Sequence, residues 1–124
     1  MHKREIKFRG KRVDNGQWIY GWLFKDALFG KLAIQQTTSE VLEDRDHLSI
    51  HTVSKEVIPE SVGQLTGLKN KHGTYIYEGD IPSRGNVVEF SFGSFNINGD
   101  VPLAAICSEI EIIGNSYEHP ELIK

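Results

Sequence analysis

The sequence predicts a mainly β domain built as a small barrel or pseudo-barrel, with a sandwich as the alternative. Clusters of turn-forming residues recur roughly every 8–12 residues, with few helical stretches between them. Asn15-Gly16 is the strongest turn signal, because this dipeptide readily supplies the positive φ angles of a type I′ hairpin. Residues 18–24 alternate at the period of two that a strand requires. We expect one domain, 1–124, in which two lobes, 1–62 and 63–124, share a core.

The composition is that of an ordinary globular protein. The chain has 14 Lys and Arg against 17 Asp and Glu, a net charge of -3, and 39% hydrophobic residues. A single Cys excludes an intrachain disulfide and any zinc or iron–sulfur site that needs several cysteines. No apolar stretch approaches the roughly 20 residues of a membrane span, and residues 1–4 lead into no signal-peptide core. We therefore expect a soluble protein of a reducing cytoplasm, without membrane contact.

The first predicted hairpin joins a strand at 6–9 to an aromatic strand at 18–24. In the second strand, Trp18, Tyr20 and Trp22 fall on one face, while Ile19 and Leu23 fall on the other. An exposed aromatic row is typical of a ligand, peptide or nucleic-acid surface, whereas a row on one strand face is more often core or a subunit interface. We favour the second interpretation, and assign Trp18, Tyr20 and Trp22 to an oligomer interface.

The remaining elements are predicted from the alternation of apolar residues and from the turn-forming residues that interrupt it. Pro59 stops a long alternating strand and can start a helical turn. In chain order the predicted elements are a strand at 32–35, a charged loop at 43–46, a strand at 48–58, a helical turn at 59–62, a strand at 75–77, a turn at 78–81, a strand at 87–92, a hairpin turn at 96–100, a helical turn at 102–106 and a strand at 108–113.

Positive charge is concentrated at the start of the chain. Residues 1–12 contain six basic side chains against one acidic side chain, and the remainder is acidic. The basic residues are Lys3, Arg4, Lys7, Arg9, Lys11 and Arg12. They indicate either an edge strand protected against aggregation or a nucleic-acid-binding arm. The segment has no interleaved aromatic residues to form a stacking platform for a single strand, which favours the edge strand.

No sequence motif for catalysis, metal binding or cofactor binding is present. The chain lacks a dinucleotide fingerprint, a phosphate-binding loop, a nucleophile elbow and a zinc-protease motif. His47 and His51 are four residues apart, but in a strand they lie roughly 13 Å apart, too far to chelate one ion directly. Asp44 and Asp46 lie nearby in the sequence, and we interpret the group as a charged loop with surface histidines. We assign no metal and no cofactor.

Three further groups have a structural and a chemical interpretation. Glu78 and Asp80 resemble an acid–base pair, but they flank Gly79 in a turn, which they more simply stabilise. Cys107 lies in an apolar run, which indicates a buried structural thiol. His119 belongs to a terminal segment that we expect Tyr117 to pack, with no catalytic partner implied. We assign no catalytic residue.

Four blocks of the sequence resemble the YopX family of phage and prophage proteins. In order they are 6–10 with 18–21, 62–69, 73 with 76–81, and 108–115 with 117–122. The resemblance implies a largely β fold with an SH3-like C-terminal part, self-association and an uncharacterised biochemical function. The chain departs from the family pattern in two ways. The stretch from Pro82 to Cys107 is shorter than in the family, and Pro82 itself removes a hydrogen-bond donor from the ladder of the first barrel strand.

The preferred function is that of a non-enzymatic phage accessory protein of the bacterial cytoplasm. It would self-associate as a homo-oligomer and bind a macromolecule, with nucleic acid the leading partner and a phage or host protein the other. The alternatives are a small hydrolase, built around Glu78 and Asp80 or around His47 and His51, and an assembly subunit that binds no ligand.

Overall fold

A computed structural model describes residues 7–41, 48–84, 86–91, 93–97 and 101–123, of which 37–41 and 48–52 are described by their backbone alone. Contacts between Cα atoms divide the chain into two compact units. The N-terminal unit is Lys7–Val62, and the C-terminal unit contains Gly63–Lys124. Among the described residues, no helix has the length and apolar character needed to cross a membrane.

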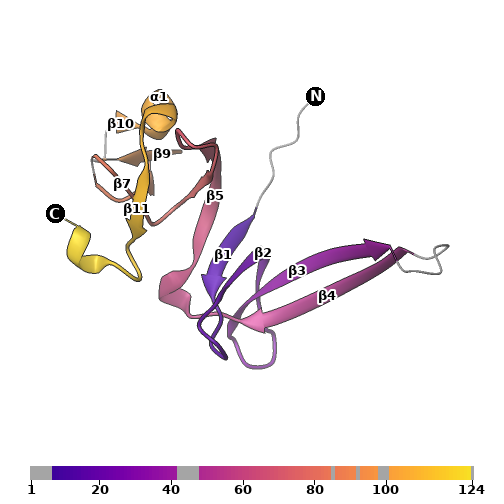
Figure 1. Cartoon of the computed structure of the whole chain (residues 1–124). Helices are drawn as coiled ribbons and strands as arrows, with labels where there is room; N and C mark the ends of the chain where they lie inside the picture. Colours follow the sequence, from indigo (N-terminus) through magenta and orange to yellow (C-terminus); the bar gives the residue numbers. More distant parts are fainter. Residues whose placement is uncertain (1–6, 42–47, 85, 92, 98–100, 124) are drawn as a thin grey trace. The chain divides into compact units, whose positions relative to one another are not determined.

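The N-terminal unit contains four strands that lie side by side in chain order and pair antiparallel (Figure 1). Its strands are β1 (Phe8–Lys11), β2 (Trp18–Lys25), β3 (Leu32–Val41) and β4 (Leu48–Glu56). β3 continues well beyond the four residues that the sequence predicts, and it pairs with β4 from Ala33 to Val41. A 3₁₀ turn, η1 (Pro59–Ser61), follows β4, as Pro59 predicts.

The turn between β1 and β2 is wider than predicted. Lys11 pairs with Trp18, and the backbone N–H of Arg12 donates to the carbonyl oxygen of Gln17 at 2.9 Å. The loop is therefore four residues, 13–16, and the prediction of a two-residue type I′ turn is wrong. The side chain of Asn15 explains the difference, because its Oδ1 accepts a hydrogen bond from the Gln17 N–H at 2.9 Å.

The core of the N-terminal unit lies on one face of this sheet. Ile19, Ile34 and Val57 are buried there, and partly buried apolar side chains from the flanking strands pack around them. Gly10 permits the close approach, because a Cβ at this position would lie 3.0 Å from the Cβ of Val57. The opposite face of the sheet has no comparable cover among the described residues of this unit.

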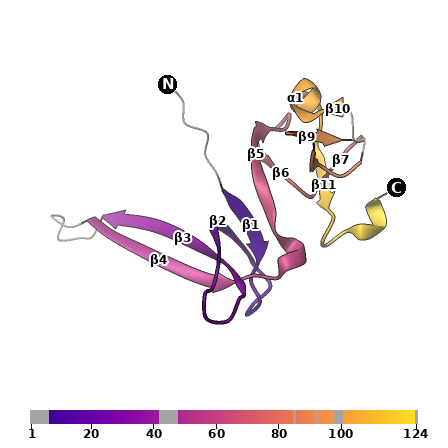
Figure 2. The same ribbon diagram turned by 180° about the vertical axis from the view of Figure 1, so that it is seen from behind.

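The C-terminal unit consists of short strands and turns (Figure 2). β5 (Gly63–Lys69), a strand that is not among the predicted elements, pairs with β6 (Tyr75–Tyr77). β7 (Asp80–Pro82) pairs with β11 (Ile112–Asn115). The third sheet is β8 (Glu89–Ser91), β9 (Ser94–Ile97) and β10 (Val101–Pro102). The helical elements are α1 (Leu103–Ile106), η2 (Cys107–Glu109) and η3 (Pro120–Leu122).

A second buried cluster holds these short elements together. Its members come from β6, α1, β9 and the segments before β8 and β11, and all are at most 7% exposed. They are Ile76, Val88, Phe95, Ile97, Leu103 and Ile110. Each of these elements and segments contributes one or two side chains, so the burial of apolar surface stabilises elements too short to be stable alone.

The mainly β prediction is confirmed, but the described strands form open antiparallel sheets and none closes into a barrel. The physical reason is strand length, because β10 has two residues and β7 ends at Pro82, which has no N–H for a longer ladder. The predicted strand at 108–113 is wrong as well, since the chain first makes η2 and β11 starts at Ile112. The SH3-like arrangement stays a prediction.

Candidate functional site

The basic strand and the aromatic strand share one face of the N-terminal sheet. In the β1–β2 ladder Arg9 lies opposite Tyr20, and Lys11 lies opposite Trp18. Directly opposed residues of an antiparallel pair point to the same side, and Trp22 continues that side at the next alternate position of β2. We call Arg9, Lys11, Trp18, Tyr20 and Trp22 the basic–aromatic face.

Cations and rings are in direct contact on this face. The Arg9 guanidinium carbon lies 4.7 Å from the centroid of the Trp18 ring, and Lys11 Nζ lies 5.1 Å from the same centroid. Lys11 Nζ also donates a hydrogen bond to the carbonyl oxygen of Gly16 at 2.9 Å. Both cations therefore contact the Trp18 ring, and each contact contributes about 0.5–1 kcal/mol at such an accessible site.

The aromatic row lies outside the buried core. Trp22 is 61% exposed and Tyr20 is 38% exposed, whereas Ile19, on the other face of the same strand, is 4% exposed. Trp18 is half-buried beneath its two cations. The prediction that this row packs in the core is therefore wrong. The oligomer interface at Trp18, Tyr20 and Trp22 stays a prediction.

The other predicted basic residues do not extend the face in the described structure. Arg12 donates two hydrogen bonds to the Asp14 carboxylate, from Nε at 2.9 Å and from Nη2 at 2.8 Å. These hydrogen bonds lower the pKa of Asp14, aided by the charge of Lys55, whose Nζ lies 3.7 Å from Asp14 Oδ2. Lys7 is half-buried one residue before β1. Lys3 and Arg4 lie outside the described residues.

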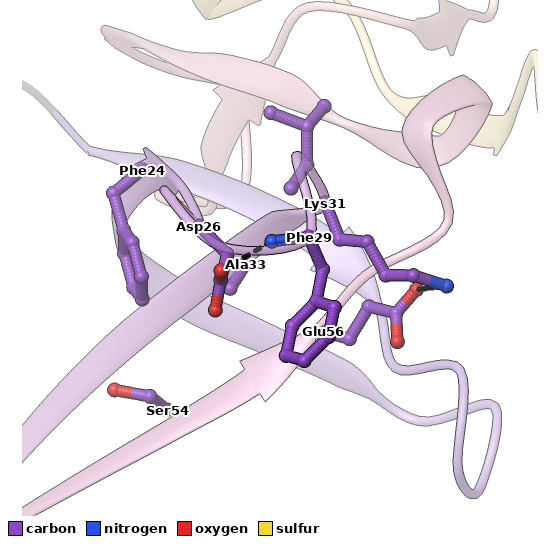
Figure 3. Close-up of a pocket in the computed structure, with 8 residues that line it drawn as sticks. Phe24, Asp26, Phe29, Lys31, Ala33, Ser54 and Glu56 are labelled. Carbon is purple, nitrogen blue, oxygen red and sulfur yellow. Dashed lines mark hydrogen bonds and ion pairs between the residues drawn. The ribbon is translucent and has the colours of Figure 1, made fainter.

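An open pocket lies on the same side of this sheet (Figure 3). Phe24 pairs with Ala33, and Ala33 pairs with Glu56, so all three point to the face that carries Trp22. With Phe29 and Ser54 they line a volume of about 220 Å³. The rings of Phe24 and Phe29 stand on either side of Ala33 in Figure 3.

The paired carboxylates of residues 78–80 have structural partners. Asp80 is 3% exposed, and its Oδ2 accepts the N–H of Tyr77 at 2.8 Å. Glu78 Oε1 accepts the N–H of Gln64 at 3.4 Å. Gly79 between them has a φ of 94°. Both carboxylates therefore stabilise backbone in and around the turn, as the simpler interpretation expects.

The remaining candidates are dispersed. His51 lies in β4, as the strand interpretation predicts, but its side chain lies outside the described structure, as do His47, Asp44 and Asp46 entirely. Within the described part of the chain, no three His, Cys, Asp or Glu side chains gather as metal ligands. Cys107 is half-buried against the C-terminal core, rather than fully buried.

His119 is held by the terminal turn. Its Nδ1 accepts the N–H of Asn115 at 3.2 Å, and its own N–H donates to the Asn115 carbonyl oxygen at 2.8 Å. Gly114 makes room for the imidazole, because a Cβ there would lie 2.8 Å from Nδ1. The ring is thus part of the packing of this turn.

Comparison with known proteins identifies the family. The family model described as YopX protein matches residues 7–124, nearly the whole chain, and the protein belongs to the YopX family. Its fold is similar to that of protein EF1440 from Enterococcus faecalis, known from a crystal structure, with a TM-score of 0.63 and 21% identity. The match covers 98% of this chain and 100% of that one. A search of curated proteins gave no match.

Two features of the site are not predicted by the sequence. The basic segment contains no interleaved aromatic residues of its own, but the neighbouring strand places Trp18 and Tyr20 beside its cations. Pairing residues 8–11 with 18–21 would have predicted this arrangement. The residues of the pocket at Phe24 and Phe29 come from β2, β3, β4 and the loop between β2 and β3. No local sequence pattern predicts that these four segments form one pocket, because the register between β3 and β4 determines which side chains lie next to one another.

Proposed function

We propose that the protein is a non-enzymatic binding module that holds single-stranded nucleic acid on its basic–aromatic face. One observation carries the proposal, the register that sets Arg9 and Lys11 opposite Tyr20 and Trp18. Proteins that bind single strands without strong sequence preference combine cations that track the backbone with aromatic rings on which bases stack. The remaining elements of the proposal are a phage or prophage origin, an accessory role and a place in the bacterial cytoplasm.

The exposed aromatic rings of β2 are available for stacking with bases, because they lie outside the buried core. Trp22, at 61% exposed, offers a ring that a base can cover, and Tyr20 offers a second one two residues away. Arg9 and Lys11 both lie close to the Trp18 ring, so the phosphates of a strand stacked on Tyr20 and Trp22 would meet positive charge beside those rings. A duplex hides its base faces, and we therefore expect single strands to bind more tightly than duplexes.

The test is fluorescence anisotropy of a labelled single-stranded oligonucleotide titrated with the full-length protein. Trp22→Ala removes an exposed ring, and we expect it to weaken binding by about 5- to 150-fold, the range for loss of one base stack. Tyr75→Ala is the matched control, because Tyr75 is 48% exposed and has its own cation, Lys69 Nζ, 4.9 Å from its ring. Equal effects of the two variants, or no binding by the wild type, would contradict the proposal.

A second candidate, self-association through the same region, is favoured by the extent of exposed apolar surface. Leu28 is 86% exposed and Phe29 is 74% exposed, and they follow the row that contains Trp22. Monomeric proteins rarely expose large contiguous apolar patches, so a second copy would cover this one. Sedimentation velocity over a concentration series should show an oligomer that Trp22→Asp dissociates. A wild type that is monomeric at every concentration would exclude this candidate.

The hydrolase alternative has less support. Asp80 and Glu78 accept backbone hydrogen bonds in the turn, and neither lines the pocket at Phe24 and Phe29. An assembly subunit without ligand would oligomerise and ignore nucleic acid in both measurements, which separates it from the proposed function.

A further inference from the structure

We propose that the pocket between Phe24 and Phe29 binds one unstacked nucleobase that carries an exocyclic amino group, as cytosine, adenine and guanine do. The inference rests on the proposed function and names what the site selects from the strand. It would make the protein prefer single strands with such bases over strands of thymine or uracil, which lack the amino group.

The shape of the pocket suits a small planar ligand. Its volume of about 220 Å³ lies below the roughly 300–1,000 Å³ typical of drug-sized ligands. Phe24 is 40% exposed and Phe29 is 74% exposed, so both rings present accessible faces. Ala33 lies between them with only a methyl group, which leaves room for a ring (Figure 3).

The loop that carries Phe29 is held in place by its own hydrogen bonds. Asp26 Oδ1 accepts the N–H groups of Leu28 and Phe29 at 2.7 and 2.9 Å. The backbone of Asp26 closes the loop, with its N–H on the Lys31 carbonyl oxygen and its own carbonyl oxygen on the Gly30 N–H, both at 2.8 Å. The backbone that carries Phe29 is therefore ordered before a ligand arrives, which reduces the ordering cost of binding.

The polar lining matches a base edge rather than a phosphate. Glu56 Oε2 and Lys31 Nζ form an ion pair at 3.6 Å, and the side chains are 43% and 59% exposed. A carboxylate accepts hydrogen bonds from amino groups such as N4 of cytosine, and it repels phosphate. The neighbouring ammonium can donate to a ring acceptor or carbonyl, and the Ser54 hydroxyl can serve either group.

The pocket continues the surface on which the strand would lie. Trp22 pairs with Gln35 and Phe24 with Ala33, so both aromatic side chains point to the same side of the sheet. A strand stacked on Tyr20 and Trp22 would therefore lead its next bases toward Phe24. The pairing of Gln35 with Ser54 places the hydroxyl on that side as well.

The experiment compares labelled oligo(dC) and oligo(dT) of equal length, titrated with the full-length protein at neutral pH. We expect the wild type to bind oligo(dC) at least about 5-fold more tightly, the lower end of discrimination by base-edge hydrogen bonds. Glu56→Ala should remove this preference while oligo(dT) still binds. Phe29→Ala should weaken binding of oligo(dC) more than binding of oligo(dT). Glu60→Ala, an exposed carboxylate of η1, is the control of equal charge change.

The outcomes separate this inference from the function on which it rests. Equal wild-type affinity for both oligonucleotides, or a preference that survives Glu56→Ala, overturns the base pocket and leaves the basic–aromatic face in place. Failure of both oligonucleotides to bind overturns both proposals, and the pocket would then suit an apolar side chain of a partner protein. A preference lost in Glu56→Ala and retained in Glu60→Ala supports both proposals.

Discussion

The guanidinium carbon of Arg9 lies 4.7 Å from the centroid of the Trp18 ring, although the ladder places Arg9 directly opposite Tyr20. The arginine therefore reaches diagonally across β1 and β2, which the separation of about 7–8 Å between diagonal neighbours allows a long side chain to do. As a result, Trp18 is half-buried by charged neighbours, while Trp22 remains open on the same face.

We expect binding of single strands to weaken steeply with salt. If Arg9 and Lys11 each neutralise one phosphate, log K falls against log salt with a slope of about −1.4, since each phosphate contributes about −0.7 in single strands. A fourfold rise in salt should then lower the affinity roughly 7-fold. Lys11→Gln should make the slope shallower by about 0.7, whereas Lys69→Gln, on β5, should leave it unchanged. Anisotropy titrations at several salt concentrations measure the slope, and a slope near zero would contradict the assignment.

Ser61→Ala should destabilise the N-terminal unit by about 1–3 kcal/mol, the cost of leaving a buried donor unpaired. The Ser61 hydroxyl oxygen accepts the Lys11 N–H at 2.8 Å and donates to the Ile58 carbonyl oxygen at 2.6 Å, and the residue is 5% exposed. Urea denaturation measures the loss. Ser108→Ala, at an exposed position, should change stability by less than about 0.5 kcal/mol. Equal stability of the two variants would show that Lys11 N–H finds another partner.

Gly21→Ala should cost about 2 kcal/mol or more, because the added methyl group has no space. A Cβ at this position would lie 2.1 Å from the carbonyl oxygen of Gln35 on β3, so the β2–β3 ladder would have to open. Gly16→Asn is the control, since Gly16 has a φ of 71°, which Asn tolerates, and a Cβ there would meet no atom within 4 Å. Thermal unfolding followed by circular dichroism would rank the variants, and a Gly21→Ala protein as stable as the wild type would be inconsistent with this register.

The Glu111 carboxylate should make a pH-dependent contribution to stability. A hydrogen bond from His72, at 3.0 Å, and one from Lys71, at 3.4 Å, lower the pKa of Glu111 below its ordinary value of 4.5. Because the folded-state pKa is the lower one, the stabilisation is fully present above the unfolded-state pKa and is lost as the pH falls through the folded-state value. The stability difference between wild type and Glu111→Gln should therefore shrink on acidification below about pH 4.5. Urea midpoints at low salt measure it, and a difference that stays constant with pH would refute the ion pair's role.

Local patterns in the sequence were sufficient for much of the secondary structure. Alternation predicts β2 and β4, and proline predicts η1, because each depends on neighbouring residues alone. The strand β5 was missed because Gly63 and Gly67 weaken its propensity, and its pairing with β6 compensates for them. The prediction of a closed barrel was wrong for a related reason. Strand length in the C-terminal unit is set by the pairing partners of each strand and not by amino-acid composition.

The candidate site was predictable only in its separate parts. The basic residues and the aromatic row were both found, yet their common face depends on register. A two-residue turn at Asn15-Gly16 would place Lys11 opposite Tyr20, whereas the observed loop places it opposite Trp18. A shift of two residues preserves the face and changes the partners. The pocket at Phe24 and Phe29 additionally requires the β3–β4 register, which no turn signal in the sequence specifies.

The chain-order arrangement of β1 to β4 has a consequence for how the protein acquires its structure. The β1–β2, β2–β3 and β3–β4 ladders each join strands that are consecutive in the chain, so each of these ladders closes after a short excursion of the chain. The pairing of Asp80 with Asn115 instead requires a much longer loop to close, with a correspondingly larger entropic barrier. On a nascent chain the meander can therefore assemble early, while the β7–β11 ladder must wait until residues 112–115 have been synthesised.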